Sequence, residues 1–154
     1  MTETESGIDG VTIVPLQRIP DERGTIYHML RRTDPHFIEF GEIYFTTIYR
    51  DVIKGWHRHS EVTLNYACIS GRVKLVLYDD RDGSSTRGVL IERFLGPDDY
   101  SLVIIPPGVW NGMKGMSDVA IVANCATLPH DPSRTDRIDP FTPEIPYDWA
   151  VRHR

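Results

Sequence analysis

Short hydrophobic runs, many of them alternating with polar residues, recur along the middle of the chain and are bounded by Gly, Pro, Asp and Asn. Such runs are typical of β-strands, and helical periodicity is hard to find. We expect strands at residues 25–30, 37–48, 52–56, 62–69, 72–78, 88–95, 101–105 and 119–125. The polar or glycine-rich stretches at residues 70–71, 79–85, 96–99, 106–108 and 112–118 predict turns.

The two faces of the central strands indicate how the sheets pack. In residues 62–69 and 72–78 apolar side chains alternate with others, but the second face also carries apolar residues such as Ala67 and Val76. A strand that is apolar on both faces belongs between layers, so we predict an all-β jelly-roll barrel or sandwich. From Leu128 onward five prolines argue against another hairpin and predict an extended C-terminal wrap.

Length, charge and cysteine content limit the functional classes. The 154 residues suffice for one domain, which we place at residues 11–154, after an acidic tail at residues 1–10 that we expect to be disordered. A net charge of −5 argues against a nucleic-acid partner, because the phosphate backbone requires a basic face. We find no membrane span and no secretory signal, and the two cysteines lie in apolar runs, so we expect a cytoplasmic protein with reduced thiols.

The candidate chemistry centres on His57 and His59, which lie two residues apart in a predicted strand. Side chains at i and i+2 of a strand point to the same face, so both imidazoles are expected in one pocket. Such a pair is suited either to proton transfer or to half of a metal site. A lone histidine is more often structural, but two on one face beside Gly55 and Lys54 favour a function.

The surrounding residues argue against a metal. A cupin-type metal site combines a His-x-His pair with a Glu three or four residues later and a further His after a Pro-x-Gly turn. Here Glu61 follows after a single residue, and Asn111 stands near the place of the later His, beyond the turn Pro106-Pro107-Gly108. Because a tight site needs several donors in fixed geometry, we expect no bound metal.

Five segments, in order, resemble one family of enzymes. They are Asp21-Glu22-Arg23-Gly24, Lys54-Gly55-Trp56-His57, residues 79–88 with Asp79-Asp80-Arg81, Ile105-Pro106-Pro107-Gly108, and Ile138-Asp139-Pro140 with Ile145 and Trp149. Their order and spacing resemble the dTDP-4-dehydrorhamnose 3,5-epimerases, which are cupin-fold isomerases. The resemblance implies a jelly roll without metal or cofactor, usually a homodimer, acting on a nucleotide-linked 4-keto-6-deoxyhexose, and we expect the nucleotide to be dTDP.

The resemblance also implies roles for individual residues. His57 matches the base that removes the proton beside the ketone, and Asp139 matches the aspartate that orients this base. Arg23 matches an arginine that contacts the diphosphate, and Lys54 stands where the family usually has an arginine. These roles are the ones that the reaction requires, because an enolate intermediate needs a base on one face, a donor at the C4 oxygen and an acid on the opposite face.

Two parts of the family pattern are absent. Residues 126–131 contain no tyrosine to serve as the acid, and the usual lysine aligns with Leu64, beside the polar Asn65. We consider His59, His130 and Tyr66 as replacements. Further candidates for substrate binding are Thr47 or its neighbour Thr46, Arg72 on a strand face, and Trp110 as a stacking platform.

Two other functions stay open at this point. The segment Gly55-Trp56-His57-Arg58-His59 also resembles the sugar-nucleotide 3,4-ketoisomerases, in which both histidines move protons. The missing tyrosine and lysine would also suit a non-catalytic sugar-nucleotide-binding protein. The segments at residues 21–24, 106–108 and 139–149 favour the epimerase.

Overall fold

The computed structural model describes residues 4–153, which are almost entirely β-strands and connections. The strands are β1 (Thr4–Glu5), β2 (Thr12–Pro15), β3 (Arg18–Asp21), β4 (Gly24–Tyr27), β5 (Glu42–Tyr49), β6 (Ile53–His59), β7 (Leu64–Ser70), β8 (Val73–Tyr78), β9 (Leu90–Leu95), β10 (Ser101–Ile105), β11 (Trp110–Gly115), β12 (Val119–Ala126) and β13 (Thr135–Arg137). One 3-10 turn, η1 (Pro132–Arg134), precedes β13. None of the described helical segments is long and apolar enough to cross a membrane.

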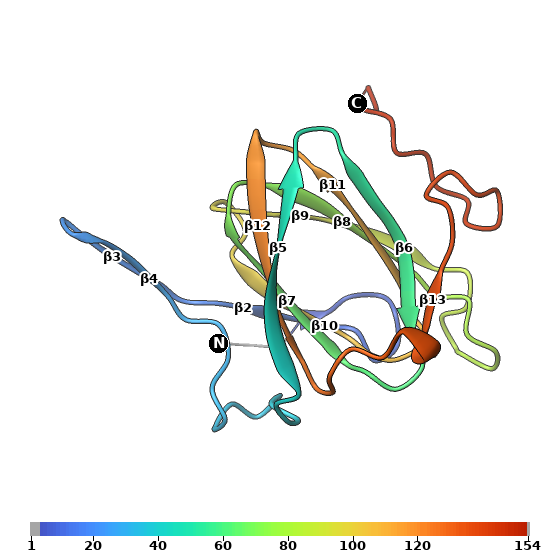
Figure 1. Cartoon of the computed structure of the whole chain (residues 1–154), viewed down its shortest axis with the longest axis horizontal. Helices are drawn as coiled ribbons and strands as arrows, with labels where there is room; N and C mark the ends of the chain where they lie inside the picture. The colour runs from blue at the N-terminus through green and yellow to red at the C-terminus, as the bar shows by residue number, and fades with distance from the viewer. Residues whose placement is uncertain (1–3, 154) are drawn as a thin grey trace.

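Two sheets pack face to face as a sandwich (Figure 1). One has the strand order β1-β2-β10-β7-β12-β5, and the other has the order β13-β6-β11-β8-β9. The main core fills the space between them with side chains such as Ile48, Leu75, Val103 and Val122. The all-β, two-layer prediction is therefore confirmed, as a sandwich and not as a closed barrel. The hairpin of β3 and β4 stands apart from both sheets and projects away from the body (Figure 1).

The turn predicted at residues 112–118 is wrong for residues 112–115, which belong to β11, whereas residues 116–118 do form the connection to β12. A Cβ atom on Gly112 would come within 3.0 Å of the Trp149 ring, and one on Gly115 would overlap the Tyr49 backbone. These glycines permit close packing inside the sheet and do not mark a turn. The absence of β11 from the predicted strands matters because β11 pairs with β6, the strand that carries His57.

Residues 4–10, which we expected to belong to a disordered tail, pack against the sandwich in this structure, while residues 1–3 lie outside the described part of the chain. Strand β1 pairs antiparallel with β2, and Ile8 is a buried member of the main core. The Ser6 hydroxyl donates to the Val11 carbonyl over 3.0 Å and holds the turn between the two strands. A few well-placed apolar and hydroxyl groups thus order a segment whose composition is polar.

The loop between β8 and β9 is anchored by a buried carboxylate. Asp79 is fully buried and accepts hydrogen bonds from the side chains of Arg81, Ser84 and Thr86. The pKa of Asp79 lies well below its ordinary value, chiefly because of the hydrogen bond from Arg81. Arg81 also donates to the Asp9 carbonyl, so this predicted turn ties the N-terminal segment to the sandwich.

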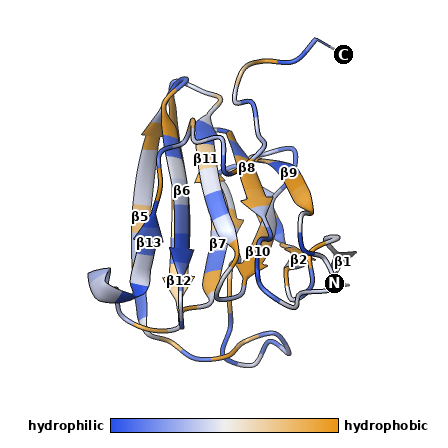
Figure 2. Cartoon of the chain, turned by 90° about the vertical axis from the view of Figure 1, so that its right-hand side faces the viewer, coloured by the Kyte–Doolittle hydropathy of each residue, from blue (hydrophilic) through white to orange (hydrophobic). Residues whose placement is uncertain are grey.

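The C-terminal segment covers the outer face of the five-stranded sheet, largely as the prolines predict. Only residues 135–137 join the sheet, as β13 beside β6. Beyond them, Ile145 and Trp149 pack with Trp56 and Trp110 in a second hydrophobic layer. Figure 2 shows the contrast within this sheet, where β6 is hydrophilic and β8 and β9 are hydrophobic.

Candidate active site

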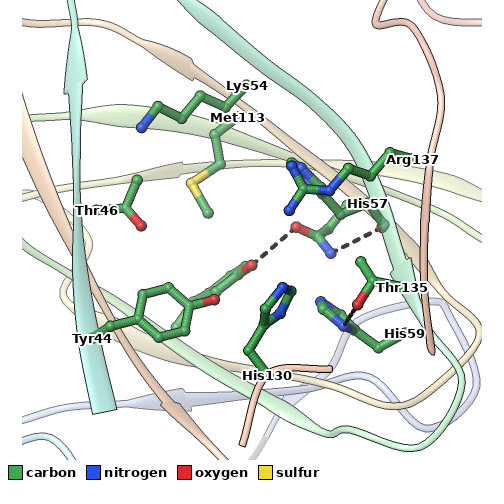
Figure 3. A pocket seen from close by; sticks show the side chains of 11 residues that line it. Tyr44, Thr46, Lys54, His57, His59, Met113, His130, Thr135 and Arg137 are labelled. Carbon is green, nitrogen blue, oxygen red and sulfur yellow. Dashed lines mark hydrogen bonds between the residues drawn. The ribbon is translucent and has the colours of Figure 1, made fainter. Parts of the chain in front are cut away.

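A pocket of about 270 Å³ opens between the two sheets (Figure 3). The six-stranded sheet contributes Tyr44, Thr46 and Tyr66, and the five-stranded sheet contributes Lys54, His57, His59, Asn111, Met113, Thr135 and Arg137. His130 completes the lining from the connection between β12 and η1. The pocket therefore brings together side chains from six separate segments of the chain.

Strand β6 supplies three of these side chains. His57 and His59 both line the pocket, as their spacing predicts. Lys54 lies three residues before His57 and would face the opposite side of a regular strand. It lines the same pocket because the register between β6 and β11 shifts, with Asn111 opposite His57 but Met113 opposite Lys54. Such an irregularity re-aims a side chain and is common next to active sites.

His57 is a neutral imidazole at physiological pH. Burial, followed by the positive charge of Arg137, lowers its pKa to about 4, with smaller effects from His59, Lys54 and His130. Both causes disfavour the protonated ring. Neutral His57 is free to accept a proton, and a bound anion would make it a stronger base by offsetting the cationic charge.

The lining of the pocket is suited to an anion. It contains Lys54, Arg137 and three histidines, and none of its described lining residues is Asp or Glu. This is a local departure from the net charge of −5 for the whole chain. Arg137 lies directly opposite His57 in the pairing of β13 with β6, so its charge acts at the base itself.

Asn111 occupies the place of the absent metal ligand and has a structural role. Its amide nitrogen donates to the His57 carbonyl over 3.1 Å, and its oxygen accepts from the Tyr66 hydroxyl over 3.1 Å. Among the described residues, no three His, Cys, Asp or Glu side chains are grouped as a metal site would require.

His59 is held by a hydrogen bond of 3.2 Å between its Nδ1 atom and the Thr135 hydroxyl. Its pKa is lowered, mainly by burial and then by His130 and Arg137. His59 thus lies beside His57 but is tied to β13, whereas no hydrogen bond of the described residues holds the His57 ring.

Asp139 lies outside the pocket lining. Its Oδ1 atom accepts from the Phe141 backbone N–H over 2.8 Å, and the described residues show no hydrogen bond between Asp139 and His57. Strand β13 ends at Arg137, two residues before Asp139, so its alternation places Thr135 and Arg137 at the pocket but does not reach Asp139. The role of Asp139 as the group that orients His57 stays a prediction.

Two predicted binding residues on the six-stranded sheet point elsewhere. Thr47 is exposed on the outer face of β5, and its neighbour Thr46 lines the pocket instead. Asn65 is buried, with its amide nitrogen donating to the Cys125 carbonyl over 2.8 Å. Neither Thr47 nor Asn65 lines this pocket, because which face of a strand meets the pocket depends on the sheet and not on the strand alone.

Three other predicted binding residues lie away from the pocket of their own chain. Arg72 is exposed over the ring of Phe94. Trp110 is buried in the outer layer, donates to Asp80 over 2.9 Å and is covered by the Arg58 guanidinium, so it offers no free stacking face. Arg23 lies at the tip of the projecting hairpin, where Asp21 pairs with it.

Arg137 and Tyr44 line the pocket but were not among the residues predicted from the sequence. Arg137 directly precedes the Ile138-Asp139-Pro140 segment. Its position two residues before Asp139, a predicted site residue, was the signal that the sequence offered. Tyr44 alternates with Thr46 and Ile48 on β5, and this face is the less exposed one.

Comparison with known proteins identifies the family of the chain. The family model described as dTDP-4-dehydrorhamnose 3,5-epimerase matches residues 5–154. A probable low-salt glycan biosynthesis epimerase, Agl13 of Haloferax volcanii, is 32% identical over 144 residues, which covers 92% of this chain and 89% of that protein.

Solved structures give the same result. A dTDP sugar isomerase from Desulfovibrio desulfuricans has a TM-score of 0.92 at 39% identity, covering 99% of this chain and 97% of the other. The 3,5-epimerase of Legionella pneumophila, solved with dTDP-4-keto-L-rhamnose, has a TM-score of 0.84 at 24% identity, covering 99% and 85%. The chain therefore belongs to the dTDP-4-dehydrorhamnose 3,5-epimerase family and is a sugar-nucleotide epimerase.

Proposed function

We propose that this epimerase inverts C3, C5 or both in a dTDP-linked 4-keto-6-deoxyhexose, with His57 as the base. The observation that carries the proposal is a neutral, half-buried histidine in a pocket lined by Lys54 and Arg137 and by no described carboxylate. The cations would hold the diphosphate, and the imidazole would take the proton beside the ketone. The enolate left behind carries charge on the C4 oxygen, where a nearby cation or hydroxyl stabilises it.

Binding and base strength are coupled in this site. Without substrate, burial and then the charges of Arg137 and, more weakly, Lys54 lower the pKa of His57. An anionic substrate would neutralise those charges and raise the proton affinity of His57 when the substrate is in place. His130, at the same pocket, is a further candidate for contact with the sugar or the phosphates.

The direct test uses dTDP-4-keto-6-deoxyglucose in deuterated water, with NMR at C3 and C5. We expect deuterium at one or both carbons and inverted product from the native chain, and neither from His57→Asn. His153→Asn, which changes an exposed histidine near the C-terminus, is the matched control and should behave as the native chain. Equal exchange by His57→Asn and the native chain would refute the assignment of the base.

The position of His59 is also compatible with a second function. Because His59 lines the same pocket as His57, a 3,4-ketoisomerase could use both rings. Such an enzyme would yield a 3-keto product and lose activity in His59→Asn as severely as in His57→Asn. An epimerase would yield the inverted 4-keto product, and His59→Asn would retain most of its exchange.

We also propose a homodimer formed through the outer face of β5 and β12. Phe45 and Tyr49 on the edge strand β5 are exposed there by 59% and 63%, and Val119 on the neighbouring strand β12 is exposed by 45%. An exposed apolar face next to unpaired strand edge groups is suited to association with a second copy. Sedimentation should give a dimer for the native chain and a monomer for Phe45→Arg.

A dimer would also give a role to Arg23. The hairpin of β3 and β4 projects from the body, exposes Ile19 and Ile26, and carries Arg23 away from its own pocket (Figure 1). Arg23 can meet a diphosphate only if the hairpin reaches the pocket of a second copy. Arg23→Gln should then raise KM in the dimer, and a monomeric Phe45→Arg variant should show the same loss.

A further inference from the structure

We infer that Tyr44 is the acid that delivers a proton to the substrate on the face opposite His57. This inference rests on the proposed function and supplies the group that the sequence lacks, since residues 126–131 contain no tyrosine. Its evidence is the direction of two hydrogen bonds in the pocket, because the Tyr44 hydroxyl accepts one and the Tyr66 hydroxyl donates the other.

Tyr44 and Tyr66 lie in one row on the six-stranded sheet, on either side of Asn124. The pairing of β12 places Asn124 opposite Tyr44 on β5 and opposite Tyr66 on β7. Asn124 is buried, so the orientation of its amide decides what it offers to its neighbours.

That orientation is set by the backbone. The Asn124 oxygen accepts from the Asn65 backbone N–H over 3.1 Å, and a backbone N–H can only donate. The Asn124 nitrogen therefore faces Tyr44 and donates to its hydroxyl oxygen over 2.9 Å. With its oxygen already accepting, the Tyr44 hydroxyl keeps its proton available for the pocket.

The Tyr66 hydroxyl, in contrast, donates its proton to a hydrogen bond within the protein. The Asn111 nitrogen donates to the His57 carbonyl, which can only accept, so the Asn111 oxygen must receive the proton of Tyr66. Tyr66 is also buried, and burial raises its pKa far above the ordinary value. Tyr66 therefore serves to connect the two sheets, and Tyr44 is the tyrosine with a proton to give.

The position of Tyr44 suits the stereochemistry. Tyr44 and His57 belong to opposite sheets and enter the pocket from opposite sides (Figure 3). A sugar ring bound between them would present one face to the imidazole and the other to the phenol. Proton removal on one face and delivery on the other inverts the carbon.

The proton balance is complete without a further reactant. His57 takes the proton from carbon, and the electron pair of the broken C–H bond moves into the enolate. The Tyr44 O–H bond then breaks as a new C–H bond forms on the opposite face, which leaves a tyrosinate and an imidazolium. The Asn124 N–H stabilises the tyrosinate, and exchange with solvent restores both groups.

His130 is the rival for this role. Its backbone N–H donates to the Glu42 carboxylate over 3.0 Å, but no hydrogen bond of the described residues holds its ring. It also lies on a connection, whereas Tyr44 is fixed within a strand. A catalytic group acts best when its position is held by its neighbours, which favours Tyr44.

The test separates exchange from inversion. In deuterated water with dTDP-4-keto-6-deoxyglucose, Tyr44→Phe should still exchange the C–H proton through His57, with retained configuration, while inversion falls by at least about 100-fold. Tyr49→Phe is the matched control, because Tyr49 lies on the same strand but faces outward. In His130→Gln, exchange and inversion should keep the same ratio as in the native chain, because any loss of binding lowers both together.

Other outcomes overturn the assignment. If Tyr44→Phe inverts at the rate of Tyr49→Phe, or loses exchange together with inversion while still binding dTDP, then Tyr44 is not the acid. If Tyr44→Phe fails to fold, fluorotyrosine at position 44 keeps the hydroxyl but alters its strength as a proton donor, so it should change the rate of inversion and not that of exchange, and an unchanged rate of inversion overturns the role. Absence of exchange in the native chain would instead count against the proposed function.

Discussion

Asn111 and His57 lie opposite each other on β11 and β6, and the Asn111 side chain donates to the His57 backbone carbonyl over 3.1 Å. The same side chain accepts the Tyr66 hydroxyl from the other sheet. One buried amide thus holds the strand of the proposed base and connects the two layers at the pocket.

Replacing Asn111 should destabilise the fold. Asn111→Ala leaves the Tyr66 hydroxyl and the His57 carbonyl without this partner, which should cost about 1–3 kcal/mol in the free energy of unfolding. Tyr66→Phe should cost less, and the double variant less than the sum, because the orphaned hydroxyl is gone. Urea denaturation measures all three, and strictly additive losses would contradict the coupling.

The pH dependence of activity follows from the lowered pKa of His57. Because the neutral ring is the base, kcat/KM should stay level as the pH falls from neutral and decline only near the free-enzyme value of about 4. The acid decline of kcat should lie at higher pH, because bound diphosphate favours the imidazolium. A decline of kcat/KM near the ordinary histidine value would contradict the predicted environment.

Arg137 should affect both binding and the base. Arg137→Met removes a cation from the pocket, so KM should rise by about tenfold, equivalent to roughly 1.4 kcal/mol. It also removes the second largest cause of the lowered pKa of His57, so the acid decline of kcat/KM should move to higher pH. Arg87→Met, which changes an exposed arginine paired with Asp82, should alter neither.

Asp139 can be tested against its predicted role. If Asp139 leaves the Phe141 amide and orients His57 when substrate binds, Asp139→Asn should lower kcat/KM by about 100-fold with little change in KM. A change within about twofold would limit Asp139 to its present contact with the Phe141 backbone.

The buried network at Asp79 should dominate stability outside the pocket. Asp79→Ala leaves the Arg81 guanidinium without its partner and should cost about 3–5 kcal/mol. Asp118→Ala removes an exposed ion pair with Arg50 and should cost less than about 1 kcal/mol. Because the pKa of Asp79 is depressed in the folded state, its stabilisation is present above the ordinary aspartate range and is lost as the pH falls below it.

Periodicity and motif order alone determined the all-β sandwich, the shared face of His57 and His59, and the family. Alternation identifies which residues of a strand share a face, since side chains two apart always point the same way. It does not identify which face meets the pocket when both faces are apolar, and so it did not distinguish Thr46, which lines the pocket, from Thr47, which does not. Nor does it show a strand such as β11, whose glycines serve close packing.

Only the tertiary structure brought Arg137 opposite His57, turned Lys54 into the pocket and fixed the sense of the Tyr44 hydrogen bond. Each of these depends on the register between strands distant in sequence. Register is set by the packing of whole sheets, which no local pattern of residues specifies.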